Sequence, residues 1–386
     1  MGTFYLGLSM AGTVSAGTYT GGTLSEINHW LSAFQTAKAE GLSLKASANT
    51  KKYKIGDTIR LEPTEIPDHE VKIKTLAGAS GGGVSAALMI TGWSIGQVED
   101  LLKNVWTSFD VKDMLCNDDL SNHKPIYSVL NVKPIDKLMN DLLAKQWGEK
   151  SNAQTLNYLD DNIEIFMTLA SYEGIPYKTT PTKSTGVSYG VHKTHLDYIK
   201  FNFSKNGTDA PPKPTLPFAN NLVFRADHSL NDDNDWKQFI LSCPATAAFP
   251  VEFKPRSLKR YRKEYVGKLF YLNYTISSAT LDYSTLQPAW PGDNNDLNPF
   301  DMEYIDGGTF NRDPHDLARA SLIESLNSEG KLKGKELPHD GKNAMACVIL
   351  VDPFPSNFDS QKLPGTVVVG IPTLINQPQY ILGAMI

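Results

Sequence analysis

The chain has 386 residues, of which 41% are hydrophobic and 20% are charged, and its formal net charge is −5. This balance is typical of a soluble globular protein with a sizeable core, and the length fits one large domain or two ordinary ones. The mild acidity and the lack of any long basic block argue against nucleic acid as a ligand.

Predicted strands and helices alternate along the chain, which indicates the α/β class, with a three-layer α/β/α architecture and a mostly parallel central sheet. Strands are predicted at residues 4–9, 71–77, 163–169, 198–203, 222–224, 269–274 and 344–351, and helices at 22–38, 83–91, 97–106 and 135–147. We expect a single domain over residues 1–386, with insertions near 41–68 and 97–215. The apolar last residues indicate a truncated chain or a helix that continues past Ile386.

A serine stands between a predicted strand and a predicted helix, in the segment Gly78-Ala79-Ser80-Gly81-Gly82. A tight strand-to-helix turn crowds the backbone around a nucleophile, and flanking glycines relieve the clashes. The serine hydroxyl then projects at the helix N-terminus, where free N–H groups and the helix dipole stabilise an oxyanion. The motif in this setting predicts that Ser80 is the nucleophile of a serine acyl hydrolase.

A second G-x-S-x-G segment, at residues 186–190, provides an internal comparison. A polar loop precedes it and no apolar helix follows it, so no strand aims Ser188 and no helix supports it. The setting therefore favours Ser80 over Ser188.

The candidate base is an aspartate rather than one of the eight histidines, none of which has so specific a setting. Asp306 is predicted at the end of a strand and is followed by Gly307 and Gly308, which allow the backbone to approach another loop closely. An isolated Asp-Gly-Gly is more often a simple turn or a helix cap. Next to the nucleophile motif, however, Asp306 becomes a candidate partner for Ser80.

In combination, these motifs resemble the patatin-like phospholipases, which use a Ser–Asp dyad without histidine. Residues 6–24 resemble the family's N-terminal strand, glycine-rich oxyanion loop and following helix. Residues 245–253 are similar to its Ala-rich segment ending in Pro and Phe, and residues 311–314 to its Asn/Pro turn into a helix. The segments occur in the family's order over residues 6–314, which implies a patatin-like fold.

The glycine-rich loop departs from the family pattern of three glycines, one residue, a basic residue and a glycine. Residues 11–17 keep only two of these glycines, lack the basic residue and make the loop about two residues longer. The resemblance implies an oxyanion hole made by the backbone N–H groups of Gly12, Thr13 or Val14 together with that of Gly81, without choosing among the loop donors.

The resemblance also implies a mechanism. Asp306 accepts the Ser80 proton, Ser80 attacks an ester carbonyl, and water hydrolyses the resulting acyl-enzyme. A carboxylate near its reference pKa of ~4 is a weak base at neutral pH, so desolvation of Asp306 must raise its basicity. The implied substrates are phospholipids or related acyl esters, and no cofactor is required.

Two alternatives remain open from the sequence. An α/β-hydrolase would use Ser80, Asp306 and then His315 or His339 as a triad. A lipid-binding or regulatory protein with a decayed site would explain the altered glycine loop. The headgroup, acyl position, chain length and oligomeric state are not determined by the sequence.

The remaining features concern metals and location. The three cysteines, Cys116, Cys243 and Cys347, argue against a disulfide framework and a zinc site, and they fit a reducing compartment or one of either redox state. Two acidic loops, at 231–235 and 293–296, lack the EF-hand spacing, so no metal is predicted.

The predicted first strand makes the N-terminus part of the fold rather than a signal peptide. No apolar stretch approaches the ~20 residues that span a bilayer. We therefore expect a cytoplasmic protein that acts at a peripheral membrane surface. Residues 254–263 carry six cations, which indicates either a solvated helix face or attraction to anionic lipid.

Overall fold

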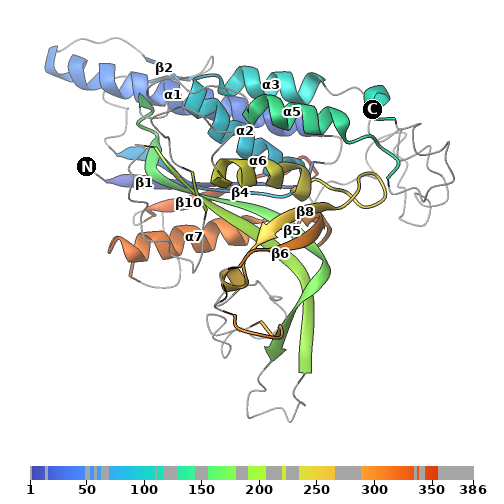
Figure 1. Ribbon diagram of the computed structural model, residues 1–386. Coiled ribbons are helices and arrows are strands. Elements are labelled where there is room, and N and C mark those ends of the chain that lie inside the picture. The colour runs from blue at the N-terminus through green and yellow to red at the C-terminus, as the bar shows by residue number, and fades with distance from the viewer. Residues whose placement is uncertain are drawn as a thin grey trace, which may run out of the picture.

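The computed structural model shows a central sheet with helices on both of its faces (Figure 1). The structure describes residues 2–13, 16–47, 53–55, 59–61, 69–108, 111–115, 128–143, 155–179, 190–205, 220–222, 234–265, 288–294, 296, 298–333, 337–338 and 344–354. Over these ranges the predicted α/β class and the three-layer arrangement with a mostly parallel sheet are confirmed.

Eight strands of the described residues form the central sheet. They are β1 Thr3–Met10, β4 Glu70–Gly78, β5 Leu159–Thr179, β6 Gly190–Ser204, β7 Asn220–Leu222, β8 Arg256–Arg260, β9 Phe300–Asp306 and β10 Ala346–Val351. Their order is β10-β1-β4-β5-β6-β7, with β9 beside β5 and β8 beside β9. Pairing is parallel from β10 to β5 and between β6 and β7, and antiparallel where β5 meets β6 and β9 and where β8 meets β9.

Most helices cover one face of the sheet (Figure 1). These are α1 Gly17–Ser47, α2 Gly81–Ile95, α3 Val98–Ser108, α5 Lys133–Leu143 and α6 Asn234–Thr246, whereas α7 His315–Ser328 covers the other face. The shorter elements are the hairpin of β2 Tyr53–Ile55 and β3 Ile59–Leu61, the helix α4 Val111–Met114, and the 3-10 turns η2 Arg262–Tyr265 and η4 Gly307–Thr309. None of the helices in the described ranges has both the length and the hydrophobicity that crossing a membrane requires.

The side chains of β1 point alternately into two hydrophobic cores, one on each face of the sheet. Leu6 and Leu8 point into the main core beneath α2, whereas Tyr5 packs against Leu322 of α7 on the opposite face. Successive residues of a strand point to opposite faces, so a strand covered on both sides is apolar throughout. Helix α2 is buried along almost its whole length, as an apolar helix between a sheet and other helices must be.

Most predicted strands and helices overlap observed ones, although β5 and β6 are longer than predicted and some predictions are corrected or lie outside the described residues. Helix α1 extends to Ser47 instead of ending near residue 38. Residues 97–215, predicted as an insertion, supply the central strands β5 and β6. The strand predicted at 269–274 and the C-terminal residues after 354 lie outside the described residues.

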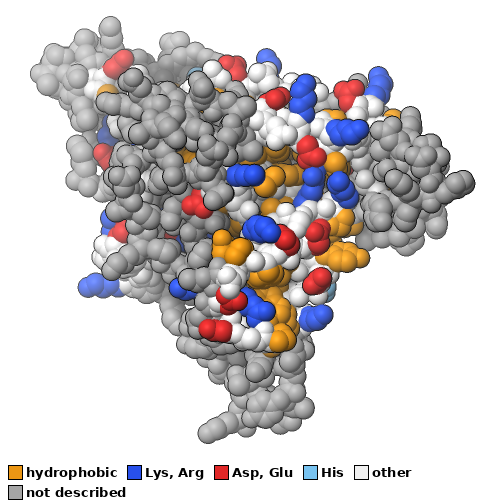
Figure 2. All heavy atoms as spheres, in the orientation of Figure 1, with side chains coloured by type: hydrophobic (Ala, Val, Ile, Leu, Met, Phe, Trp, Pro, Cys, Tyr) orange, Lys and Arg blue, Asp and Glu red, His pale blue; other side chains and the backbone are white. Residues whose placement is uncertain are grey.

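The cationic run at residues 254–263 forms the strand β8 and the turn η2 rather than a helix face. Arg256 and Lys259 pair with Asp136 and Asp301, at 2.9 and 2.7 Å. In the space-filling view, Lys and Arg side chains over this part of the sheet alternate with Asp and Glu (Figure 2). The run is therefore partly paired with acidic side chains and does not make a uniformly positive surface.

The sheet brings two distant segments together beside β5. Strand β4 ends with Gly78 opposite Met167, and β9 ends with Asp306 opposite Leu169. Strand β6 occupies the other edge of β5 over these residues, so β4 and β9 share one edge and run toward each other along it. The turns that follow both strands therefore meet at Thr168.

Candidate active site

Ser80 lies at the turn between β4 and α2, in a strained backbone conformation. Its φ is 54° and its ψ is −127°, in the positive-φ region that residues other than glycine seldom occupy. A Cβ on Gly78 would lie 2.5 Å from the backbone of Gly82, and a Cβ on Gly82 would overlap the carbonyl of Met10. The two motif glycines are thus required by the closeness of the turn, as the sequence motif predicts.

The side chains of Ser80 and Asp306 are in direct contact. The Ser80 hydroxyl donates a hydrogen bond of 2.5 Å to Oδ2 of Asp306, across 226 positions of sequence. The contact follows from the meeting of β4 and β9 beside β5. The structure therefore brings together the two side chains that the sequence motifs single out.

The Asp306 carboxyl group is buried, with 2% of its surface exposed. Its Oδ1 accepts a bond of 2.6 Å from the Gly308 N–H, and its own N–H donates to the Ala248 carbonyl. Burial raises the pKa of Asp306 to about 6, against the opposing effect of the bonds from Ser80 and Gly308. Asp306 is thus a stronger base than an ordinary aspartate and still ionises at neutral pH.

Steric crowding explains why both residues after Asp306 are glycines. A Cβ on Gly307 would overlap the Thr168 carbonyl, because η4 passes directly over β5 at this point. A Cβ on Gly308 would lie 2.9 Å from Oδ1 of Asp306 and would displace the carboxylate. The Asp-Gly-Gly segment therefore fixes the carboxylate as well as forming a turn.

Thr246, at the end of α6, holds the backbone of the nucleophile. Its hydroxyl accepts the Ser80 N–H at 3.1 Å and donates to the Thr168 carbonyl at 2.7 Å. The side chain is fully buried. Sequence reasoning missed this role, although Thr246 lies in the Ala-rich segment, because neither of its partners is nearby in the sequence.

The four predicted oxyanion donors differ in whether their N–H groups are free. The Gly12 N–H donates to the Arg312 carbonyl at 3.0 Å, so it is not a free donor, and its predicted role is corrected. Val14 lies outside the described residues. Thr13 follows Gly12 in the same loop, and Gly81 begins α2, where the first N–H groups have no acceptor within the helix. Thr13 and Gly81 are therefore the predicted donors that remain.

No histidine in the described ranges is hydrogen-bonded or ion-paired with Ser80 or Asp306. His315 begins α7, and its ring lies 3.4 Å from the carboxylate of Asp316. His195 stacks on Phe310 and bonds through Nδ1 to the Ser171 carbonyl. His339 and Ser188 lie outside the described residues.

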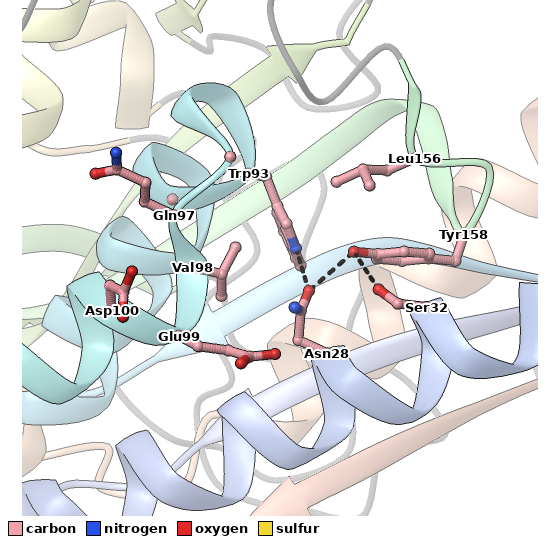
Figure 3. A pocket seen from close by; sticks show the side chains of 11 residues that line it. Asn28, Ser32, Trp93, Gln97, Val98, Glu99, Asp100, Leu156 and Tyr158 are labelled. Atoms are coloured by element: carbon pink, nitrogen blue, oxygen red, sulfur yellow. Dashed lines mark hydrogen bonds between the residues drawn. The ribbon is translucent and has the colours of Figure 1, made fainter. Parts of the chain in front are cut away.

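A separate cavity of about 310 Å³ lies between α1, the C-terminal end of α2 and the start of α3 (Figure 3). Within it, Oδ1 of Asn28 accepts bonds of 2.9 Å from both the Trp93 indole and the Tyr158 hydroxyl. Neither Ser80 nor Asp306 lines this cavity. In the part of the chain that the structure describes, no three His, Cys, Asp or Glu side chains gather as a metal site would need.

Comparison with known proteins identifies no activity for this chain. No family model matches the chain. The chain is 24% identical over 394 aligned residues to the uncharacterized protein y4iI of Sinorhizobium fredii. The alignment covers 92% of this chain and 49% of that protein. The chain thus spans about half the length of this relative, whose name states no activity.

Proposed function

We propose that the chain is a serine acyl hydrolase of the patatin-like type, with Ser80 as nucleophile and Asp306 as base. The observation that carries the proposal is the 2.5 Å hydrogen bond between Ser80 Oγ and the buried carboxylate of Asp306. The strained strand-turn-helix setting of Ser80 supports it, since strain of this kind gathers at functional sites.

In the proposed reaction, Asp306 takes the Ser80 proton while Oγ attacks the carbonyl carbon of an ester. The N–H groups of Gly81 and Thr13 stabilise the oxyanion, each such donor being worth about 3 kcal/mol. The bond to the alcohol then breaks, and Asp306 returns the proton to the departing alcohol oxygen. Water, deprotonated by Asp306, attacks the acyl-enzyme; the bond from Oγ to the acyl carbon breaks, Asp306 returns the proton to Ser80 Oγ, and the carboxylic acid leaves.

We propose an acyl lipid, such as a phospholipid at a membrane surface, as the substrate. Two large apolar side chains in segments next to the candidate site are exposed: Phe249 by 43% and Phe310 by 52%. Phe249 directly follows Ala248, which bonds to Asp306, and Phe310 bonds to Gly307 through its N–H. Exposed apolar side chains beside a nucleophile suit a substrate with long acyl chains.

We also propose a cytoplasmic location. The free thiol of Cys243 is buried, which fits a reducing compartment such as the cytoplasm.

The nucleophile is tested with a fluorophosphonate probe on the purified full chain. The probe should label Ser80, and Ser80→Ala should abolish both labelling and ester hydrolysis. Labelling at Ser188 instead would contradict the proposal. His315→Ala and His339→Ala should keep most of the activity, whereas an inactive but folded variant of either would favour the α/β-hydrolase triad.

The substrate class is tested by comparing esters in two physical states. Turnover of phospholipid in phosphatidylcholine vesicles should exceed turnover of water-soluble short-chain esters. Efficient cleavage of the short esters, with no cleavage of vesicle lipid, would count against a lipid substrate and leave the Ser–Asp chemistry intact. A folded protein that neither hydrolyses esters nor reacts with the probe would favour a lipid-binding or regulatory role.

A further inference from the structure

We propose that the hydroxyl group of Thr13 is itself an oxyanion donor, in addition to the backbone N–H groups of Thr13 and Gly81. The inference rests on the proposed acyl hydrolase function and names a side chain that takes part in it.

The first observation is an unsatisfied polar atom. Thr13 is only 1% exposed, and its Oγ1 has no hydrogen-bond partner within the described residues. Leaving a buried hydroxyl without a partner costs free energy, so most buried hydroxyl groups have one. Thr13 therefore carries a hydroxyl proton that no group within the described residues accepts.

The second observation is the position of this hydroxyl beside the nucleophile. A Cβ on Gly81 would overlap Oγ1 of Thr13 and would lie 3.2 Å from its Cβ. Gly81 follows Ser80 directly, and a Cβ on Gly12 would lie 3.6 Å from Cβ of Ser80. Thr13 is thus packed on the residue after the nucleophile and follows a residue that faces the nucleophile.

The third observation is that the surroundings hold Thr13 in place. The Gly12 N–H bonds to the Arg312 carbonyl at 3.0 Å, and the Thr13 carbonyl accepts the Ala16 N–H at 2.6 Å. The ring of Trp106 closes over Gly81 and donates to Ser85, whose hydroxyl bonds to the Gly81 carbonyl. A donor fixed before the reaction stabilises a developing charge without reorganisation.

The fourth observation is that one predicted backbone donor of the loop is already engaged. The Gly12 N–H is engaged by Arg312, so the loop offers fewer free backbone donors than its sequence predicts. A threonine hydroxyl can rotate about its Cβ–Oγ1 bond to point its proton at the oxyanion. No covalent bond to Thr13 forms or breaks, and its proton stays on Oγ1 throughout.

The experiment compares Thr13→Val, which removes the hydroxyl at nearly constant shape, with Thr13→Ser, which keeps it. Thr13→Val should lower kcat and the rate of fluorophosphonate labelling by about 10²- to 10³-fold, the effect of removing one oxyanion donor, with little change in KM. Thr13→Ser should keep most of the activity. Thr13→Val should unfold at the same temperature as the unmodified chain or at a higher one, because a methyl group replaces an unpartnered hydroxyl.

Thr91 provides the matched control. It is 1% exposed, lies in α2 and also has an Oγ1 without a partner in the described ranges. Thr91→Val should leave kcat unchanged. If Thr13→Val does not fold, Thr13→Ala takes its place in the same comparison.

Three outcomes overturn the inference. The first is an unchanged kcat in Thr13→Val, and the second is an equal loss in Thr13→Val and Thr13→Ser, which would assign the effect to shape. The third is an equal loss in Thr91→Val. In each of them the unmodified chain is still labelled at Ser80, so the proposed function stands. Absence of labelling and hydrolysis in the unmodified chain would instead refute the proposed function itself.

Discussion

Asp306 accepts hydrogen bonds from the Ser80 hydroxyl and the Gly308 N–H, and both bonds favour its ionised form. Burial nevertheless outweighs them and raises its pKa to about 6. The same residue is thereby ionised at neutral pH and more basic than an exposed aspartate. These properties lead to two predictions about pH.

The first prediction concerns activity. The rate of Ser80 labelling should fall as the pH drops through about 6, because protonated Asp306 cannot accept the serine proton. A base with the ordinary pKa of ~4 would keep the rate constant to near pH 5. The measurement is the labelling rate between pH 4.5 and 8. A pH profile that changes shape in a folded His315→Ala variant would instead show that this histidine takes part in the proton transfer.

The second prediction concerns stability. The pKa of Asp306 is raised from 3.8 to about 6 on folding, so the folded state binds its proton more tightly. The stability from this group is therefore present below about pH 4 and lost as the pH rises through about 6. A shift of ~2 units corresponds to about 3 kcal/mol.

Asp306→Asn is neutral at every pH and avoids this loss. The variant should gain stability relative to the unmodified chain between pH 4 and pH 7.5, by up to about 3 kcal/mol, while losing activity. Urea unfolding at the two pH values measures the difference. A stability difference that is the same at both would contradict the assignment of the raised pKa to Asp306.

At the scale of elements, α1 and α3 pack closely because glycines of α1 face Trp106. A Cβ on Gly21 would lie 2.8 Å from Cδ1 of Trp106, whereas a Cβ on Gly22 would have no atom within 4 Å. Trp106 also closes over Gly81, so the packing of the two helices reaches the candidate site.

The third prediction compares these neighbouring glycines. Gly22→Ala should stabilise the fold by up to about 1 kcal/mol, because alanine is the better helix former. Gly21→Ala should destabilise it by roughly 1–3 kcal/mol, because Trp106 must move. It should also slow Ser80 labelling. Thermal unfolding and labelling rates of both variants provide the check, and a stabilised Gly21→Ala would show that the helices are not in close contact.

The fourth prediction concerns the end of α6. Thr246→Val removes the acceptor of the Ser80 N–H and the donor to the Thr168 carbonyl, and each buried group left unpaired costs about 1–3 kcal/mol. The variant should be less stable and should be labelled more slowly per folded molecule. Thr246→Ser keeps the hydroxyl and should restore the labelling rate. If both variants were labelled at the rate of the unmodified chain, Thr246 would have no part in positioning Ser80.

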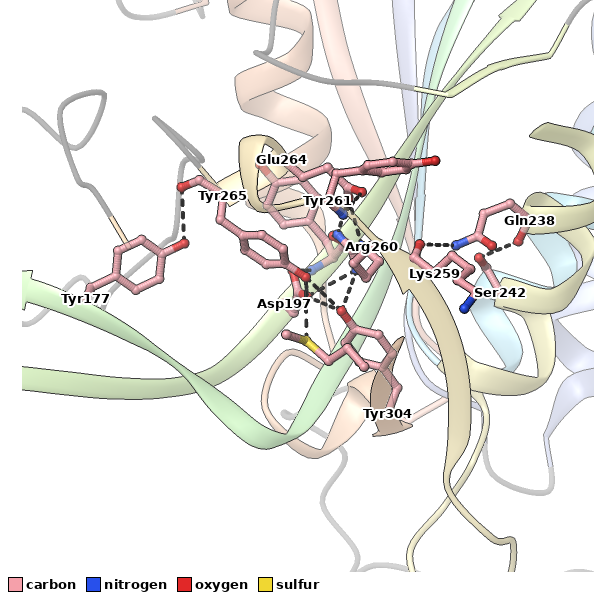
Figure 4. A network of polar contacts seen from close by, with 12 residues as sticks. Tyr177, Asp197, Gln238, Ser242, Lys259, Arg260, Tyr261, Glu264, Tyr265 and Tyr304 are labelled. Atoms are coloured by element: carbon pink, nitrogen blue, oxygen red, sulfur yellow. Dashed lines mark hydrogen bonds and ion pairs between the residues drawn. The ribbon is translucent and has the colours of Figure 1, made fainter. Parts of the chain in front are cut away.

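At the scale of the whole molecule, a buried polar network joins the strands around β9 (Figure 4). Arg260, at the end of β8, pairs with Asp197 of β6 at 3.2 Å and with Glu264 of η2 at 2.7 Å, and it donates to the Tyr304 hydroxyl. Tyr304 and Tyr265 also donate to Asp197. Tyr304 lies two residues before the end of β9, where the candidate base is found.

The fifth prediction tests this network. Arg260→Met should destabilise the fold by about 3–5 kcal/mol, because it leaves the carboxylates of Asp197 and Glu264 buried without their cation. Lys259→Met is the neighbouring control: the Lys259–Asp301 pair is about 60% exposed, and such pairs contribute about 0–1 kcal/mol. Denaturant unfolding measures both. Losses of equal size would mean that the buried network contributes no more than a surface ion pair.

The sequence by itself determined the elements that carry the candidate site. The apolar runs of β1 and α2 and the strand pattern of β4 are local, and the structure shows all three elements close to their predicted positions. Ser80 and Asp306 stood out because a strained turn and a glycine-flanked carboxylate leave traces in adjacent residues. Such features depend on backbone conformation over a few positions, which neighbouring residue types govern.

Only the tertiary structure decided which atoms pair with which. In the structure the Gly12 N–H bonds to the Arg312 carbonyl, and the Thr246 hydroxyl bonds to the Ser80 N–H. Arg260 is buried and paired with Asp197, although it belongs to a run that the sequence predicts as a helix face or a lipid-binding patch. These partners lie far apart in the chain and meet through the packing of strands and helices, as β4 and β9 meet along one edge of β5. A hydrogen bond depends on the distance between two groups in space, and strand pairing, rather than local composition, sets that distance.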